Sequence, residues 1–212
     1  MPVNTAAPLV SDHLTELGLN SDVLLFAMNY DFDKVESKGL LKRFKQNDGM
    51  IDIDIACAMY DAECQLQELV WFKQLRDKAE SIRHQGDSLN GKDRGEQAMY
   101  HAPFDQEQIR LYLKRVPKTI KHIALLASSY YGQPFTSVKA GEMHLGDDEG
   151  NRTLEINIKQ LPKDCASLWV ATLSREIDGW YMTTQQLPLS DHALDDAAKQ
   201  VAYELARTLP SV

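Results

Sequence analysis

The residues best suited to chemistry in this sequence are carboxylates, and the first group of them lies in a strand-like stretch. This stretch, Ile51-Asp52-Ile53-Asp54-Ile55, alternates apolar and acidic residues. In a β-strand the isoleucines would share one face, and Asp52 and Asp54 would lie side by side on the other. Because the two negative charges repel each other, a cation placed between them would stabilise the pair.

The second group lies in a polar loop, residues 84–97, that is interrupted by three glycines. Its side chains offer four more oxygen ligands: Asp87, Asn90, Asp93 and Glu96. A hard cation such as Ca²⁺ takes roughly six to eight oxygen ligands, usually from carboxylates and carbonyls of flexible loops. We therefore predict a metal site in which these four residues join Asp52 and Asp54 at one end of a β-fold.

Both groups also have a purely structural explanation. Paired aspartates are common on the polar outer face of an edge strand, and a polar loop is commonly just solvated. Asp31 is either a further ligand or a turn residue. The loop is not an EF-hand, because the Asp-x-Asp-x-Asp-Gly order is absent. The six histidines are dispersed and no nucleophile has a recognisable base, so we expect neither a transition-metal site nor an enzyme.

Composition narrows the function classes further. The chain has 212 residues, of which 43% are hydrophobic and 25% charged, which is typical of a globular protein with a real core. A net charge of -8 argues against a nucleic-acid partner. Cys57, Cys64 and Cys165 form no close pair, so we expect neither a disulfide framework nor a zinc site. Without a leader or a transmembrane run, we expect a cytoplasmic protein.

The elements that must position these carboxylates are short strands. Apolar or alternating runs separated by turn signals occur at 23–28, 50–60, 66–72, 109–113, 122–130, 137–145, 153–158, 167–173 and 180–184. This spacing predicts an all-β fold, a two-sheet antiparallel β-sandwich with short helices. Apolar residues at three- and four-residue steps from Leu194 to Leu209 predict a C-terminal amphipathic α-helix that ends before Pro210. We divide the chain into an N-terminal arm (1–20), a sandwich domain (21–189) and a helix (190–212) packed on the same domain.

Several motifs, in order, resemble one known family. They are Tyr30-Asp31, the Ile51 to Ala56 strand, Leu69-Val70-Trp71-Phe72-Lys73-Gln74-Leu75, His84-Gln85-Gly86-Asp87, Val116-Pro117, Gln133-Pro134-Phe135 and Leu173-Ser174-Arg175 with Gly179-Trp180. In their order and spacing, residues 22–187 resemble the tellurium-resistance TerD family of bacterial stress proteins. The resemblance implies a calcium-binding β-sandwich, and Asp52, Asp54 and Asp87 match the family's acidic pattern.

The loop departs from that pattern after Asp87. The family typically has a dense run of Gly, Asp and Glu here, whereas this chain inserts Lys92 and Arg94, and Ser88 replaces the usual Asn. We therefore expect a calcium-binding stress-response and tellurite-resistance protein that acts by binding, with its affinity for Ca²⁺ weakened or lost. Other proteins of a tellurium-resistance complex would be its partners. The alternative is a metal-independent scaffold or adaptor in which Lys92 or Arg94 neutralises the aspartates.

Overall fold

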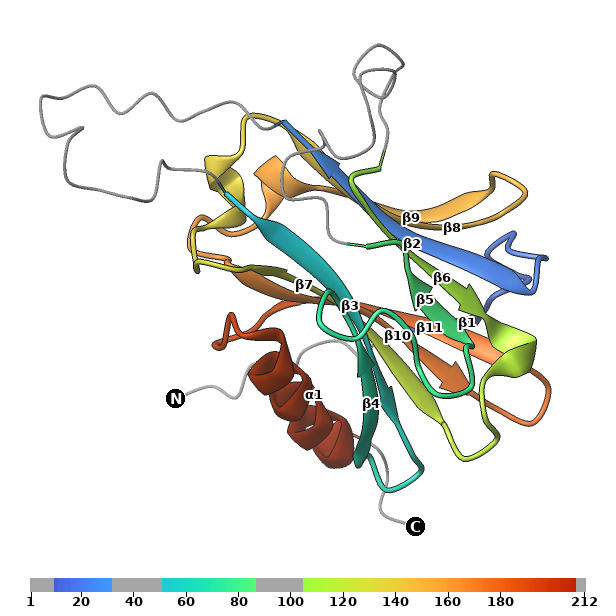
Figure 1. Cartoon of the computed structure of the whole chain (residues 1–212). Coiled ribbons are helices and arrows are strands. Elements are labelled where there is room, and N and C mark those ends of the chain that lie inside the picture. Colours follow the sequence, from blue (N-terminus) through green and yellow to red (C-terminus); the bar gives the residue numbers. More distant parts are fainter. Residues whose placement is uncertain (1–9, 32–50, 87–104, 209–212) are drawn as a thin grey trace, which may run out of the picture.

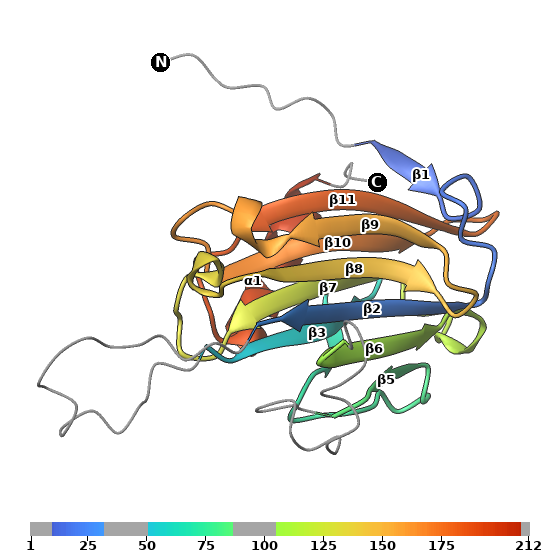
Figure 2. The same ribbon diagram turned by 90° about the horizontal axis from the view of Figure 1, so that it is seen from above.

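The computed structural model describes residues 10–31, 51–86 and 105–208, which form three layers: two β-sheets and one helix (Figure 1). Sheet A has the strand order β1-β11-β10-β7-β3-β4, and sheet B has the order β5-β6-β2-β8-β9. All neighbouring strands are antiparallel. Figure 2 looks onto sheet B, with sheet A and α1 behind it. The two-sheet antiparallel β-sandwich with a C-terminal helix is confirmed.

The bounds of the elements are as follows. The strands are β1 (Ser11–His13), β2 (Val23–Tyr30), β3 (Ile53–Tyr60), β4 (Leu66–Val70), β5 (Ile82–His84), β6 (Glu107–Tyr112), β7 (His122–Ser129), β8 (Gly141–Asp147), β9 (Arg152–Asn157), β10 (Ser167–Arg175) and β11 (Trp180–Pro188). The short 3-10 helices are η3 (Leu113–Arg115), η4 (Phe135–Ser137) and η5 (Ile158–Gln160), and the α-helix is α1 (Leu194–Thr208).

The main core lies between the two sheets. Alternate residues of each strand point inward, so Ile53 and Ile55 from β3 belong to the same core cluster as Phe26 and Met28 from β2, and all four are buried. Burying each of these side chains contributes roughly 1.5–3 kcal/mol. The three cysteines are free and buried.

The helix α1 covers the outer face of sheet A. Its apolar stripe, which includes Ala198 and Val201, packs on Ala58 and Trp169, and Tyr60 Oη donates a 2.8 Å hydrogen bond to the Ala198 carbonyl. Sheet A is therefore covered on both sides, which explains why every residue of β3 and β7 is buried. Within the described part of the chain, no helix combines the length and apolar character needed to cross a bilayer.

The N-terminal arm predicted over residues 1–20 is, in its described part, joined to sheet A. β1 pairs with β11, with Ser11 opposite Thr183 and His13 opposite Tyr181. Leu14 and Leu19 are buried in the main core. A three-residue strand is too short for alternation to reveal it, and its partner lies near the other end of the sequence. Residues 10–20 thus belong to the sandwich.

Candidate functional site

Four strand ends meet at one end of the sandwich. β2 ends at Tyr30 and β3 begins at Ile53, while β5 ends at His84 beside the start of β6 at Glu107 (Figure 2). The two sheets are joined here, because Tyr30 Oη accepts a 3.1 Å hydrogen bond from the Ile53 N–H. We call this region the acidic end, defined by Asp52, Asp54, Asp105 and Glu107.

Asp52 and Asp54 lie at this end, at the start of β3. Ile53 points into the main core, whereas Asp54 shares the opposite face of β3 with Ala56 and Ala58. The Asp52 carbonyl is fixed by a 2.8 Å hydrogen bond from the Tyr130 N–H. Asp54 is only 3% exposed, so the simple picture of a solvated outer face does not hold for it. A buried carboxylate needs a hydrogen-bond donor or a cation to offset the cost of its burial, and of the two aspartates Asp54 is the more buried.

The edge of β3 explains why Tyr30 lies here. β4 pairs with β3 only over residues 57–60, so the first half of β3 has no strand neighbour on that side among the described residues. The Tyr30 hydroxyl takes the place of such a neighbour for the Ile53 N–H. Burial raises the pKa of Tyr30 well above its ordinary value of 10.0, and the negative charges of Asp52, Glu107 and Asp54 add to the rise, partly offset by the Ile53 N–H. The three carboxylates therefore share one electrostatic environment.

A buried histidine fixes the flanks of the polar loop. His84 Nδ1 accepts a 3.1 Å hydrogen bond from the Gly86 N–H, so the ring proton belongs on Nε2. That Nε2 lies 3.0 Å from the Glu107 carboxylate, although the angle is poor for a hydrogen bond. Next to it, the Gln106 side chain bonds both the N–H and the carbonyl of Tyr30, at 2.5 and 2.6 Å. These contacts hold the acidic end in one conformation.

The remaining predicted ligands, Asp87, Asn90, Asp93 and Glu96, lie outside the described residues. The same is true of Lys92 and Arg94. Asp31 lies just after β2, is exposed, and donates its backbone N–H to the Ala140 carbonyl at 2.9 Å. Within residues 10–31, 51–86 and 105–208, no three His, Cys, Asp or Glu side chains are grouped so as to hold a metal ion.

The sequence analysis missed Glu107, although a signal for it exists. Glu107 alternates with Ile109 and Leu111, so it shares their inward face and is buried. An acidic residue in phase with two core residues can be recognised in the sequence as a buried charge. The charged groups that raise the pKa of Tyr30 are all carboxylates, and His84 Nδ1 is already engaged by the Gly86 N–H. Such a set suits a hard cation such as Ca²⁺ and not a transition metal, provided that further oxygens complete it.

Comparison with known proteins agrees with this architecture. The sequence pattern of the TerD domain matches residues 21–191. The tellurium resistance protein TerZ of Serratia marcescens is 23% identical over 176 residues, which cover 83% of this chain and 86% of that protein. Two solved structures share the fold. A homologue of the telluride resistance protein TerD from Streptomyces coelicolor has a TM-score of 0.65 at 14% identity, covering 84% of this chain and 96% of its own. SAV2460, a protein of unknown function, has a TM-score of 0.65 at 16% identity, covering 82% and 94%. The chain belongs to the TerD domain family.

Proposed function

We propose that this TerD-domain protein binds Ca²⁺ at its acidic end and serves tellurium resistance and the stress response by binding, not by catalysis. The observation that carries the proposal is the position of Asp52, Asp54 and Glu107 at the strand ends next to Tyr30. The Tyr30 hydroxyl bonds the Ile53 N–H between the two aspartates, and the charges of all three carboxylates raise the pKa of this buried phenol. Three carboxylates in one poorly solvated region repel one another, and a divalent cation would relieve that repulsion.

Each described residue has a role in such a site. Asp54 on β3 would supply the buried carboxylate, and Asp52, just before β3, a second and less buried one. His84 would position Gly86 and Glu107, which flank the loop. The loop residues Asp87, Asn90, Asp93 and Glu96 would complete the oxygen ligands. When bound, the ion would neutralise the cluster and order the strand ends relative to the loop.

A metal-independent scaffold is the second candidate. It is favoured by the lack of a three-ligand group among the described residues and by the cations at positions 92 and 94. A salt bridge from Lys92 or Arg94 to one of the aspartates would neutralise the cluster without calcium. Both candidates act by binding partner proteins, such as other members of a tellurium-resistance complex, and they differ in what balances Asp54.

Titration of Ca²⁺ into chelator-treated full-length protein, followed by calorimetry and thermal unfolding, tests the proposal. We expect binding heat and a stabilisation of about 2.7 kcal/mol at a hundredfold excess over Kd. Asp54→Asn should abolish both signals. The matched control is Glu63→Gln, an exposed carboxylate in the turn at the other end of β3, which should retain them.

The absence of heat and of any melting shift at millimolar Ca²⁺ would rule out the calcium site. In that case the scaffold alternative predicts an effect of the two cations. Lys92→Ala or Arg94→Ala should then either destabilise the protein or create calcium binding where the parent has none.

A further inference from the structure

The outer face of sheet B carries a row of arginines that the proposed calcium site does not use. Arg76 lies opposite Arg83 in an isolated bridge, and Arg83 lies opposite Arg110 in the β5–β6 pair. Their inward-pointing neighbours, Ile82 and Ile109, are buried in the main core. Arg115 follows β6 and is exposed. We call Arg76, Arg83, Arg110, Arg115 and Tyr112 the arginine face.

The stability of the fold does not explain such a row of arginines. Like charges directly opposite each other in a sheet are destabilising, and the chain as a whole has an excess of acidic residues. Arg110 nevertheless forms no hydrogen bond or ion pair with any described residue, and its Nε is buried without a partner. The residue as a whole is half-buried, so a carboxylate from outside the molecule is a suitable partner for the part of its side chain that reaches solvent.

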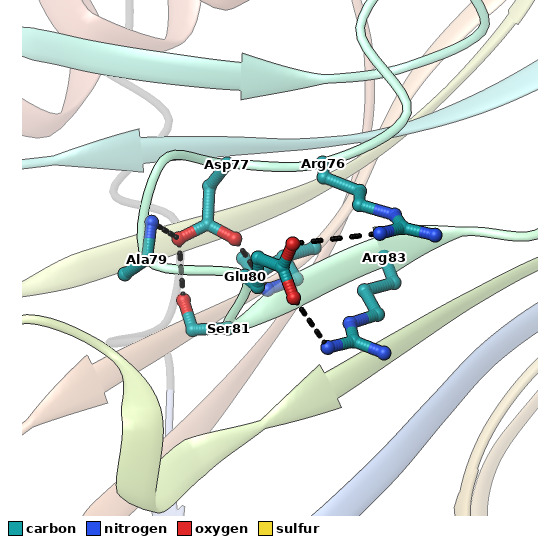
Figure 3. Close-up of polar contacts among 7 residues, drawn as sticks. Arg76, Asp77, Ala79, Glu80, Ser81 and Arg83 are labelled. Atoms are coloured by element: carbon teal, nitrogen blue, oxygen red, sulfur yellow. Dashed lines mark hydrogen bonds and ion pairs between the residues drawn. The ribbon is translucent and has the colours of Figure 1, made fainter.

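One carboxylate of the described chain already shows what this surface binds. Glu80 Oε2 lies 2.7 Å from Arg83 Nη2 and Glu80 Oε1 lies 3.4 Å from Arg76 Nη1, so the carboxylate bridges two arginines (Figure 3). It compensates one of the four positive charges of the arginine face. Arg110 and Arg115 have no carboxylate partner in the described part of the chain.

A tight turn holds Glu80 in place. Asp77, which is 3% exposed, accepts hydrogen bonds from Ala79 N at 3.2 Å, Ser81 Oγ at 2.8 Å and Ile82 N at 2.7 Å (Figure 3). Glu80 itself has a φ of 53°, a left-handed conformation that is uncommon for a residue with a side chain. The turn therefore presents the arginines and the bridging carboxylate on a fixed backbone.

The composition of the surface points to a protein partner. Arg115 and Arg83 lie over the ring of Tyr112, with guanidinium carbons 4.6 and 5.3 Å from its centroid. Arginine and tyrosine are the residue types that dominate binding energy at protein interfaces. The neighbouring Lys114 is instead paired with Asp22. A long nucleic acid is disfavoured, because the net charge of -8 over the rest of the molecule would repel it.

We propose that the arginine face is a docking surface for an acidic segment of a partner protein. Carboxylates of that segment pair with Arg110, Arg83 and Arg115, and an apolar or aromatic partner side chain packs on Tyr112. Glu80 competes with the incoming carboxylates for Arg83, and so sets the affinity.

Fluorescence anisotropy of a labelled oligoglutamate peptide, with the full-length protein in chelator at low salt, tests the proposal. Arg110→Gln and Arg83→Gln should each weaken binding about tenfold, as for interface arginines generally. Arg152→Gln is the matched control, since Arg152 lies on β9 of the same sheet but is paired with Glu142 and Glu155. Glu80→Gln should tighten binding. The melting temperature of Arg110→Gln should not fall, because the substitution removes repulsion between like charges.

Three outcomes would overturn the proposal. The first is equal affinity of the Arg110→Gln variant and the parent protein. The second is binding of oligoglutamate no tighter than that of oligoglutamine. The third is tighter binding of a single-stranded DNA oligonucleotide of equal charge, which would make the surface a nucleic-acid site. Because chelator is present throughout, the result is independent of whether Ca²⁺ binds at the acidic end.

Discussion

The acidic end and the arginine face are built on the same two strands. In β5, His84 points inward and its neighbour Arg83 points outward; in β6, Glu107 points inward and Arg110 outward. The pleat of the sheet thus sorts opposite charges onto opposite sides, although they are close in sequence. A net charge for the whole chain hides this separation, and neither region can be inferred from it.

The two regions also differ in burial, and so in what a substitution should change. Asp54, His84 and Glu107 are buried, whereas Arg76 and Glu80 are more than half exposed. Changes near the buried groups should lower the free energy of unfolding. Changes on the exposed face should alter binding and leave stability almost intact.

The largest expected effect comes from Asp77, the buried support of the arginine face. Asp77→Ala removes the acceptor of three hydrogen bonds, one of them from the Ile82 N–H. We expect the free energy of unfolding to fall by about 3 kcal/mol. Urea denaturation measures it, with the exposed Asp164→Ala as control. A loss below about 1 kcal/mol would mean that the turn is not a rigid support.

A smaller loss is expected at the acidic end for Tyr30→Phe. Without the hydroxyl, the Ile53 N–H at the edge of β3 loses its acceptor. This should lower the free energy of unfolding by about 2 kcal/mol. The control is Tyr203→Phe on the outside of α1, where the ring is exposed and no change is expected. If both variants unfold at the same denaturant concentration, Tyr30 does not join the sheets as inferred.

Acidification should weaken the fold through two buried histidines. Burial lowers the pKa of His122 and of His144 below the ordinary value of 6.5, while Glu176 near His122 and Asp105 near His144 oppose the lowering. Both rings stay neutral in the native state, whereas the unfolded chain takes up protons below about pH 6.5. Their contribution is therefore complete above that pH and declines as the pH falls toward the lowered native values.

Denaturation at about pH 7.5 and about pH 5.5 measures this decline. The double variant His122→Gln/His144→Gln should lose less stability between the two pH values than the parent protein. An identical loss in both proteins would assign the pH dependence to other groups.

The smallest expected effect on stability belongs to Glu80→Gln. It removes the two ion pairs by which Glu80 bridges Arg76 and Arg83 at the surface, and this should change the free energy of unfolding by less than about 1 kcal/mol. A larger loss would show that Glu80 serves the fold of the turn, not the binding properties of the arginine face.

Local patterns in the sequence predicted the features that depend on one strand or one helix. Alternation placed Ile53 and Asp54 on opposite faces of β3, and three- and four-residue steps predicted α1, because both signals repeat within a few residues. The six metal ligands remain a prediction. Asp52 lies just before β3 and Asp54 lies on it, and the other four lie outside the described residues.

Features that depend on register between distant segments were not visible in the sequence. The arginine row exists only because residues 76, 83 and 110 fall opposite one another, and a shift by one residue would turn alternate side chains inward. The edge strand β1 is likewise defined by β11. The outer face of sheet A is a further example. Ala58 and Trp169 become core residues only because α1, which is distant in the sequence, packs on them.

The packing of α1 on sheet A comes late in biosynthesis. Because α1 follows all eleven described strands in the sequence, a ribosome completes both sheets before the residues that shield sheet A emerge. Until then an apolar surface that includes Leu126 and Trp169 is open to other nascent chains and to chaperones. Translation that stops after β11 would leave a product with its strands complete and one sheet uncovered, prone to aggregate and to be degraded.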